Sequence, residues 1–138
     1  MSHFENRIYG SILGLAIGDA FGAPVEFKAR GTYPKVVEYM PGGEFNLPKG
    51  YWTDDTSLAL CIIDSINKTK SFDLKSQMYN FRKWWHEGFM SSTGFCFDIG
   101  NTTKKALTKK AGRRRLLPCA LGQTLKGRSS GTGREPSS

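Results

Sequence analysis

The spacing of apolar residues predicts helices along most of this chain. From Ile8 onward, apolar residues recur at helical intervals, and glycines stand at every fourth position from Gly10 to Gly22. This pattern predicts a buried first helix in close contact with a neighbour. The same spacing and favourable capping residues predict three more helices, which begin near Asp54, at Asp73 with an end near Gly88, and around Asp98 to Asn101. No segment has the alternation of a strand, so the predicted fold class is all-α.

A long irregular connection separates the first two predicted helices. Prolines and glycines recur between Gly31 and Gly50 too often for any regular period to persist. Loops of this length are uncommon in compact domains and often form part of binding sites. We therefore interpret this segment as a loop that borders a functional site.

The basic charge of the chain is confined to its C-terminal part. The formal net charge of +8 over 138 residues suggests at first a nucleic-acid or membrane partner. Residues 1–103, however, carry ten Lys and Arg against eleven Asp and Glu, whereas residues 104–138 carry ten against one. The segment after Lys110 is also rich in Arg, Gly and Ser without a sustained apolar period. We expect one folded domain over residues 1–110 and a basic, disordered tail over residues 111–138.

Several classes of protein are not expected from this sequence. No aromatic residue alternates with the basic residues of the tail to stack on bases, so a nucleic-acid partner is not expected. The apolar run from Ile8 meets Asp19 too early to span a bilayer, which argues against a membrane helix. Three cysteines without a close pair, and without histidine at zinc-finger spacing, support neither a disulfide framework nor a structural zinc site: Cys61, Cys96 and Cys119. We expect a reducing, cytoplasmic location.

The most specific local feature is the segment Trp52-Thr53-Asp54-Asp55-Thr56 at a predicted helix start. Asp and Thr are favoured capping residues, so a helix cap alone would explain it. A cap needs only one oxygen, however, and the second of two adjacent carboxylates has to tolerate its neighbour's charge, which a bound cation would relieve. Clustered carboxylate and hydroxyl oxygens suit hard ions such as Mg²⁺ or Mn²⁺.

Two further polar segments also admit ordinary structural roles. Asp19 and Glu26 interrupt an apolar, glycine-rich stretch, where Asp19 could accept a hydrogen bond from a neighbouring backbone amide and Glu26 could face solvent. Residues 91–103 contain Ser, Thr, Gly and Asn around Asp98, and a polar turn that Asp98 caps would account for them. Taken one at a time, these segments do not distinguish a structural role from a functional one.

In this order, the three segments resemble the ADP-ribosylglycohydrolase family across nearly all of residues 8–108. The resemblance rests on the stretches GLAIGDAFGAPVE, WTDDT and STGFCFDIGNTT. It implies the N-terminal half of an all-α orthogonal helical bundle around a two-metal centre, with Mg²⁺ or Mn²⁺ at the floor of an ADP-ribose cleft. The implied activity is hydrolysis of the glycosidic bond between ADP-ribose and a protein side chain. An ADP-ribosylated protein or ADP-ribose itself would then be the partner.

The resemblance also implies roles for individual residues. Thr53, Asp54 and Asp55 match the first half of the metal ligands. Glu26 and Asp98 would be the catalytic residues, with Glu26 as a general acid/base or as the group that positions a metal-bound water, and Asp98 next to the ribose. The implied substrate-binding residues are Gly94, Phe95, Cys96, Phe97 and Asn101.

The sequence departs from the family pattern after about residue 106. The second half of the family pattern adds aspartates that complete the metal site, whereas Glu135 is the one acidic residue after Lys110 in this chain. Because Mg²⁺ needs six oxygens, we expect little or no hydrolase activity from this chain alone. We also expect a truncated bundle to expose apolar faces, including Phe81, Trp84 and Trp85. A shifted reading frame or an altered splice is our hypothesis for the tail.

A second function remains open at this point. The alternative is a catalytically inactive fragment that binds ADP-ribose or serves as a scaffold. The sequence does not determine which modified residue would be the substrate, and it does not determine the oligomeric state.

Overall fold

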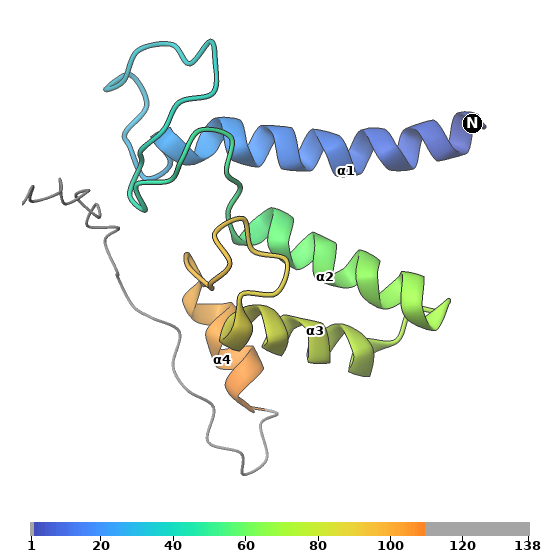
Figure 1. The fold of residues 1–138 in the computed structure, drawn as a ribbon. Coiled ribbons are helices and arrows are strands. Elements are labelled where there is room, and N and C mark those ends of the chain that lie inside the picture. Colours follow the sequence, from blue (N-terminus) through green and yellow to red (C-terminus); the bar gives the residue numbers. More distant parts are fainter. Residues whose placement is uncertain (1, 110–138) are drawn as a thin grey trace, which may run out of the picture.

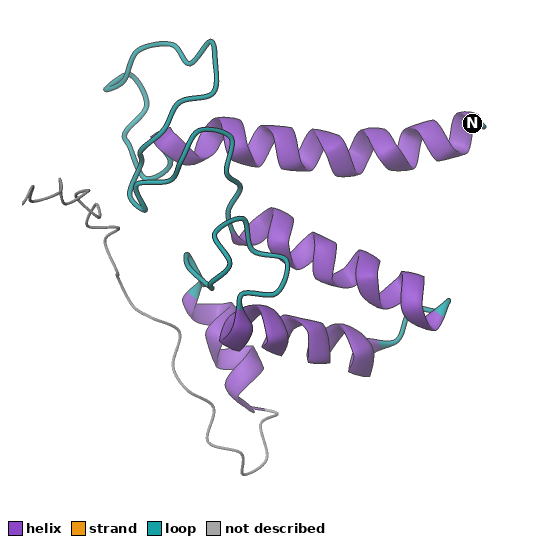
Figure 2. Cartoon of the chain, in the orientation of Figure 1, coloured by secondary structure: helices purple, strands orange, loops and turns teal. Residues whose placement is uncertain are grey.

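The structure, a computed structural model, describes residues 2–109; the tail predicted for residues 111–138 lies outside the described part. The described elements are α1 (His3–Gly22), the 3₁₀ turn η1 (Ala23–Val25), α2 (Asp54–Thr69), α3 (Leu74–Glu87) and α4 (Asn101–Lys109) (Figure 1). Residues 2–109 contain no strand (Figure 2), and their one isolated β-bridge joins Gly42 to Leu47 within the long loop. The all-α prediction is confirmed.

Helices α2 and α3 run antiparallel and contain most of the core (Figure 1). The core cluster consists of Cys61 from α2, Trp84 and Trp85 from α3, Cys96 from the following loop and Leu107 from α4. Trp84 is 1% exposed and Trp85 is 7% exposed. The expectation that these two tryptophans are exposed is therefore wrong, because the 88–100 loop and α4 supply side chains that pack against them.

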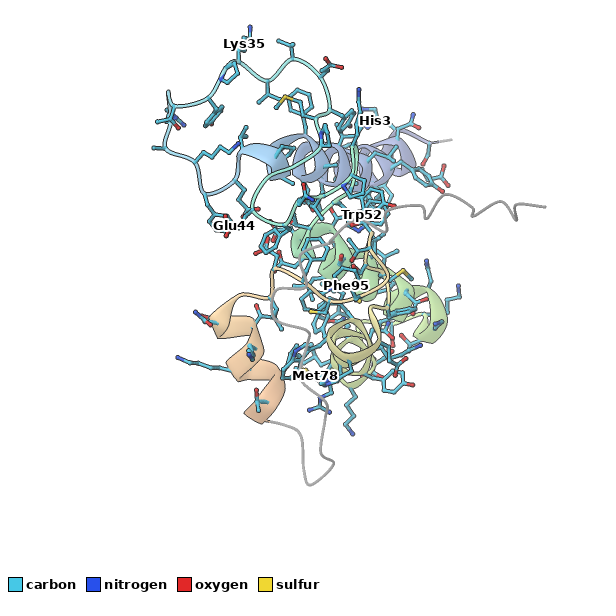
Figure 3. All side chains as sticks on the ribbon, turned by 60° about the vertical axis from the view of Figure 1, so that its left-hand side comes forward. His3, Lys35, Glu44, Trp52, Met78 and Phe95 are labelled. Carbon is cyan, nitrogen blue, oxygen red and sulfur yellow. The ribbon has the colours of Figure 1, made fainter. Side chains whose placement is uncertain are left out.

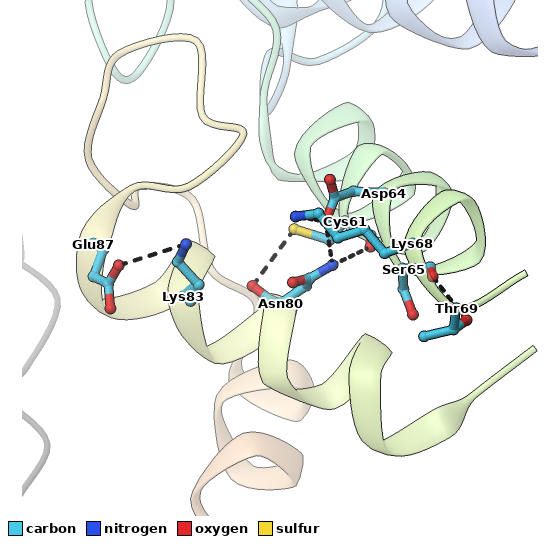
Figure 4. A network of polar contacts seen from close by, with 8 residues as sticks. All are labelled: Cys61, Asp64, Ser65, Lys68, Thr69, Asn80, Lys83 and Glu87. Atoms are coloured by element: carbon cyan, nitrogen blue, oxygen red, sulfur yellow. Dashed lines mark hydrogen bonds and ion pairs between the residues drawn. The ribbon is translucent and has the colours of Figure 1, made fainter.

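A polar network links the same two helices (Figure 4). The side-chain amide of Asn80 donates to the carbonyl of Cys61 and to the carboxylate of Asp64, each at 2.9 Å. Asp64 also forms an ion pair with Lys68 at 2.8 Å, one helical turn further along α2. The hydrogen bond from Lys68 is the main reason that the pKa of Asp64 is lowered. These contacts give the buried side-chain amide of Asn80 two acceptors on α2 and so link the two helices.

Helix α3 begins and ends where the sequence predicts. Its N-cap is Asp73, whose carboxylate accepts a hydrogen bond from the amide of Lys75 at 2.8 Å. It ends at Gly88, which adopts a left-handed conformation with φ of +70°. A Cβ atom at Gly88 would lie 2.1 Å from the carbonyl oxygen of Gly94. Glycine at this position therefore allows the loop after α3 to fold back closely on itself.

Helix α1 projects from the rest of the described residues and is exposed along most of its length (Figure 1). Ala20 is the only buried residue of this helix, and Leu13 and Ile17 are 58% and 54% exposed. A Cβ atom at each of its four spaced glycines would meet no other atom within 4 Å. The prediction of a buried first helix in close contact is therefore wrong for this structure. The reason is that residues 2–109 supply no surface that packs along this helix.

The segment His3–Val25 is, among residues 2–109, the one helical segment whose length and composition would permit it to cross a membrane, with a hydropathy of 1.4. A core helix of a soluble protein passes the same criterion. Asp19 near the end of this segment contacts α2 through hydrogen bonds. The expectation that the chain has no membrane helix stays a prediction.

Candidate active site

The N-terminus of α2 is capped by a side chain from α1. The carboxylate of Asp19 accepts hydrogen bonds from the backbone amides of Thr53, at 3.0 Å, and Thr56, at 3.1 Å. It also accepts from the hydroxyls of Thr53, at 2.8 Å, and Thr56, at 2.6 Å. Thr53 is the N-cap residue of α2, but its hydroxyl donates to Asp19 and makes no cap hydrogen bond of its own, so a helix cap alone does not explain this segment. Asp19 thus joins the glycine-rich segment that contains it to the segment 52–56.

The polar segment 91–103 and the residue before it lie against the segment 52–56 through Trp52. The hydroxyl of Ser92 donates to the carbonyl of Trp52 at 2.6 Å, and the indole nitrogen of Trp52 donates to the carbonyl of Met90 at 3.4 Å. In Figure 3, Trp52 lies between α1 and α2, whereas Phe95 lies on the far side of Trp52 from α1, beside the α2–α3 pair. All three segments therefore converge on one end of α2.

The long loop borders the same region. Gly43 has a φ of +76°, and a Cβ atom there would lie 2.7 Å from the carbonyl oxygen of Ala23, so glycine lets the loop approach η1 closely. Leu47 from the loop and Ala23 are buried together with Phe97 in a second, smaller core cluster. The interpretation of this loop as a border of the site is consistent with these contacts, because Ala23 lies three residues before Glu26.

The convergence brings acidic side chains close enough to affect one another's ionisation. Glu26, which follows η1, lies close to Asp98; burial and the charges of Asp19 and Asp55 raise the pKa of Glu26, and the interaction with the Asp98 side chain lowers it by less. Burial and the neighbouring Asp55 raise the pKa of Asp54 to about 6. Burial and the nearby carboxylates, Asp54 first among them, raise the pKa of Asp98 to about 7. Among residues 2–109, the carboxylates of Glu26, Asp54 and Asp98 form no ion pair with a Lys or Arg side chain.

Backbone conformation contributes to the position of Asp98. Its φ is +54°, in the left-handed region that Asp adopts more readily than most residues. Phe27, which follows Glu26, is also left-handed, with φ of +62°. Such conformations are often found at functional sites. Both catalytic candidates are therefore at or next to unusual backbone positions, which sequence reasoning did not foresee.

The donor set fits part of the coordination shell of a hard cation. Clustered carboxylates that raise one another's pKa, without a cationic side chain to compensate them, are the environment that a divalent ion stabilises. Within residues 2–109, however, no group of three or more His, Cys, Asp or Glu side chains is arranged to hold a metal ion. The described residues therefore offer oxygen ligands but do not complete a metal site.

The predicted substrate-binding residues are divided between surface and core. Gly94, Phe95 and Asn101 are exposed, whereas Cys96 is 3% exposed in the main core and Phe97 is 9% exposed in the smaller one. Cys96 and Phe97 thus contribute to packing in this structure. The binding roles of all five residues stay predictions.

Sequence reasoning noted Asp19 but did not include it in the site. The available signal was an acidic residue within a glycine-rich apolar helix. A hydrogen bond from a neighbouring backbone amide was an ordinary explanation for it. Its partners are in fact 34 and 37 residues away in the chain. The loop residue Phe45 was also missed; its ring lies 5.3 Å from that of Phe97 and 6.3 Å from that of Phe27.

Comparison with known proteins identifies the family. The family model described as ADP-ribosylglycohydrolase matches residues 1–134, a range that includes most of the basic C-terminal segment. The chain therefore belongs to the ADP-ribosylglycohydrolase family.

Individual relatives agree with this assignment. The chain is 44% identical over 102 residues to the ADP-ribosylarginine hydrolase Tri1 of Pseudomonas putida (strain GB-1), a match that covers 74% of this chain and 27% of that protein. It is 45% identical over 102 residues to Tri1 of Serratia proteamaculans (strain 568), with 74% and 28% covered. A solved ADP-ribosylglycohydrolase-related protein complex is 42% identical with a TM-score of 0.63, and the match covers 76% of this chain and 32% of that one. The chain thus matches about a third or less of the length of these relatives.

Proposed function

We propose that residues 2–109 form one part of the catalytic centre of a divalent-metal-dependent ADP-ribosyl hydrolase. The observation that carries the proposal is the convergence of carboxylates from three segments, where burial and mutual repulsion raise the pKa of Asp54 to about 6 and that of Asp98 to about 7. The names of two relatives with 44% and 45% identity support ADP-ribosylated arginine as the substrate. The bond to be cleaved is then the N-glycosidic bond to the guanidinium group.

Thr53, Asp54 and Asp55 would hold the ion. Thr53 is 3% exposed, and its hydroxyl hydrogen is engaged by Asp19 at 2.8 Å, so the lone pairs of this oxygen remain available to a ligand. A bound Mg²⁺ or Mn²⁺ would orient the ribose hydroxyls and lower the pKa of a water near the anomeric carbon. The remaining oxygens of the ion's coordination shell would come from outside residues 2–109.

Glu26 and Asp98 are suited to proton transfer at the glycosidic bond. Cleavage at the anomeric carbon of a ribose develops positive charge on the ring, which nearby carboxylates stabilise. The leaving guanidine needs a proton, and a carboxyl with a pKa of about 7 retains one near neutral pH. The side chains of Glu26 and Asp98 lie close enough to influence each other, so the two groups would be in position to exchange that proton.

The first experiment measures Mn²⁺ binding to this chain by electron paramagnetic resonance of the free ion. Wild type should bind Mn²⁺ weakly, because its ligand set is incomplete. The double variant Asp54→Ala/Asp55→Ala should lose at least about tenfold in affinity. The matched control is Glu38→Ala/Glu87→Ala, which removes two exposed carboxylates and should bind as wild type does. Equal affinity in the wild type and the Asp54/Asp55 variant would contradict the proposed metal role.

The second experiment tests the reaction in a chimera. The matched segment of the Pseudomonas putida relative is replaced by that of this chain, and release of ADP-ribose from an ADP-ribosylated arginine peptide is measured. We expect Mg²⁺-dependent release that the Asp54→Ala/Asp55→Ala version lacks. The chain alone should show little or no release. A folded chimera that binds ADP-ribose without Mg²⁺ and releases none would favour the catalytically inactive binding fragment instead.

A further inference from the structure

We propose that Asp19 is a positioning residue of the candidate active site, which holds the first turn of α2 and orients the Thr53 hydroxyl toward the bound cation. The part that concerns the cation rests on the proposed function. The part that concerns the helix turn rests on hydrogen bonds in the structure.

The carboxylate of Asp19 accepts hydrogen bonds from four donor groups. One oxygen of Asp19 accepts from the amide and the hydroxyl of Thr53, at 3.0 and 2.8 Å. The other accepts from the amide of Thr56 at 3.1 Å, from its hydroxyl at 2.6 Å, and from the shared Thr53 amide at 3.0 Å. Thr53 and Thr56 directly flank Asp54 and Asp55. The backbone that bears both proposed metal ligands is therefore held on either side by the same group.

Burial makes these hydrogen bonds difficult to replace with water. Thr53 is 3% exposed and Thr56 is 2% exposed, so their hydroxyls and amides depend on a protein partner. A carboxylate is an acceptor with about four lone-pair sites, and it also meets the positive end of the α2 dipole. Asparagine would keep one acceptor oxygen but would turn an NH₂ group toward donors. Asp19 is therefore the residue type that this arrangement requires.

The hydrogen bond to Thr53 has a specific consequence for ligand binding. A hydroxyl carries one hydrogen and two lone pairs, and the hydrogen of Thr53 is directed at Asp19. The lone pairs are then left for an electrophile such as a metal ion. Without Asp19, the hydroxyl would rotate freely and its hydrogen could face the cation.

The charge of Asp19 also acts on the centre. It contributes to the raised pKa values of Glu26, Asp54 and Asp98, so it lies within electrostatic reach of all three. A neutral helix cap would satisfy the amides without this effect. A carboxylate in this position adds attraction for a cation from outside its coordination shell.

The test compares Asp19→Asn with Asp64→Asn in the 138-residue chain. Asp64 is the matched control because it is also hydrogen bonded, to Asn80 and Lys68, but lies on the other part of α2. Mn²⁺ affinity is measured by electron paramagnetic resonance, and the free energy of unfolding is measured by urea titration on the same samples. We expect Asp19→Asn to lose about 10- to 100-fold in Mn²⁺ affinity, as is typical when a residue that holds a metal ligand in position is replaced. Asp64→Asn should lower stability and leave Mn²⁺ affinity unchanged.

Three further outcomes decide the proposal. Asp19→Asn with reduced stability and wild-type Mn²⁺ affinity would overturn it, since Asp19 would then be a helix cap only. If Asp19→Asn does not fold, Thr56→Val replaces it, because this variant removes one hydroxyl donor to Asp19; a reduced Mn²⁺ affinity supports the proposal and an unchanged one overturns it. If Asp54→Ala/Asp55→Ala binds Mn²⁺ as wild type does, the proposed function itself fails, a result that does not depend on any Asp19 variant.

Discussion

Helix α2 carries acidic residues in two contrasting environments. At its N-terminus, Asp54 lies beside Asp55, and burial together with that neighbour raises its pKa to about 6. Further along, Asp64 is hydrogen bonded to Lys68 and Asn80, and its pKa is lowered. At neutral pH the ionised carboxylate of Asp64 therefore stabilises the folded state, whereas that of Asp54 destabilises it. This contrast agrees with the binding role that we propose for the N-terminal end of α2 and with a stabilising role for the interface with α3.

The largest expected effect concerns the core at the α2–α3 interface. Trp84→Ala should lower the free energy of unfolding by about 3–5 kcal/mol, because it leaves a cavity where a 1% exposed indole was packed. Tyr79→Ala is the control on the same helix, since Tyr79 is 64% exposed and its loss should change stability by less than about 0.5 kcal/mol. Urea unfolding followed by circular dichroism measures both. Similar losses for the two variants would contradict the assignment of Trp84 to the core of the α2–α3 interface.

The next effect concerns the polar network at that interface. Asn80→Ala should cost about 1–3 kcal/mol, because it removes two hydrogen bonds and leaves the buried Cys61 carbonyl without the amide that now donates to it. Asn67→Ala, at an exposed position of α2, serves as its control. The same urea experiment applies. An Asn80 variant as stable as the control would show that the network does not stabilise the helix pair.

A pH titration sharpens the contrast from the other end of α2. Asp54 and Asp98 have folded-state pKa values of about 6 and about 7, above the value of 3.8 for an unperturbed Asp. The folded state therefore binds protons more tightly than the unfolded state does. Ionisation of these two carboxyls destabilises the folded state, fully above about pH 7 and no longer toward about pH 4. The free energy of unfolding should be higher at pH 5 than at pH 8 by on the order of 1–2 kcal/mol, after allowance for partial exposure.

The matched variant is Asp54→Asn/Asp98→Asn, which removes both of these carboxyl groups and leaves the other side chains unchanged. Its stability should change little between pH 5 and pH 8. Saturating Mg²⁺ should stabilise wild type more than this variant. An equal pH dependence in the two proteins would show that these carboxyls do not titrate as their surroundings imply.

The smallest effect concerns the ion pair between Lys68 and Asp64. Lys68→Ala should lower stability by about 0.2–1 kcal/mol at pH 7, since the lysine side chain is 65% exposed and the pair is screened by solvent. The folded-state pKa of Asp64 is lowered, so this contribution is present above the unfolded pKa and is lost as the pH falls through the folded one. Thermal unfolding at pH 7 and pH 2.5 measures the difference. A loss that persists at pH 2.5 would assign the effect to packing of the lysine stem instead.

Local patterns account for the predictions that were confirmed. The bounds of α3 follow from an Asp that caps its own helix and a Gly that adopts φ of +70°, and both signals lie within one turn of the helix ends. The start of α2 and the irregular loop before it follow from equally local residue preferences. The burial of Trp84 and the exposure of α1 were not predicted correctly. Helical periodicity identifies an apolar face but does not say what covers it.

What the sequence by itself determined is the helical class, the start of α2, both ends of α3, the family, and the acidic segments worth attention, because periodicity, caps and motifs depend on residues close together in the chain. Only the tertiary structure decided which polar groups meet. The pairing of Asp19 with Thr53 spans 34 residues, and the interaction of Glu26 with Asp98 joins segments on either side of α2 and α3. Such contacts, and the pKa shifts that follow from them, depend on distances that folding alone sets.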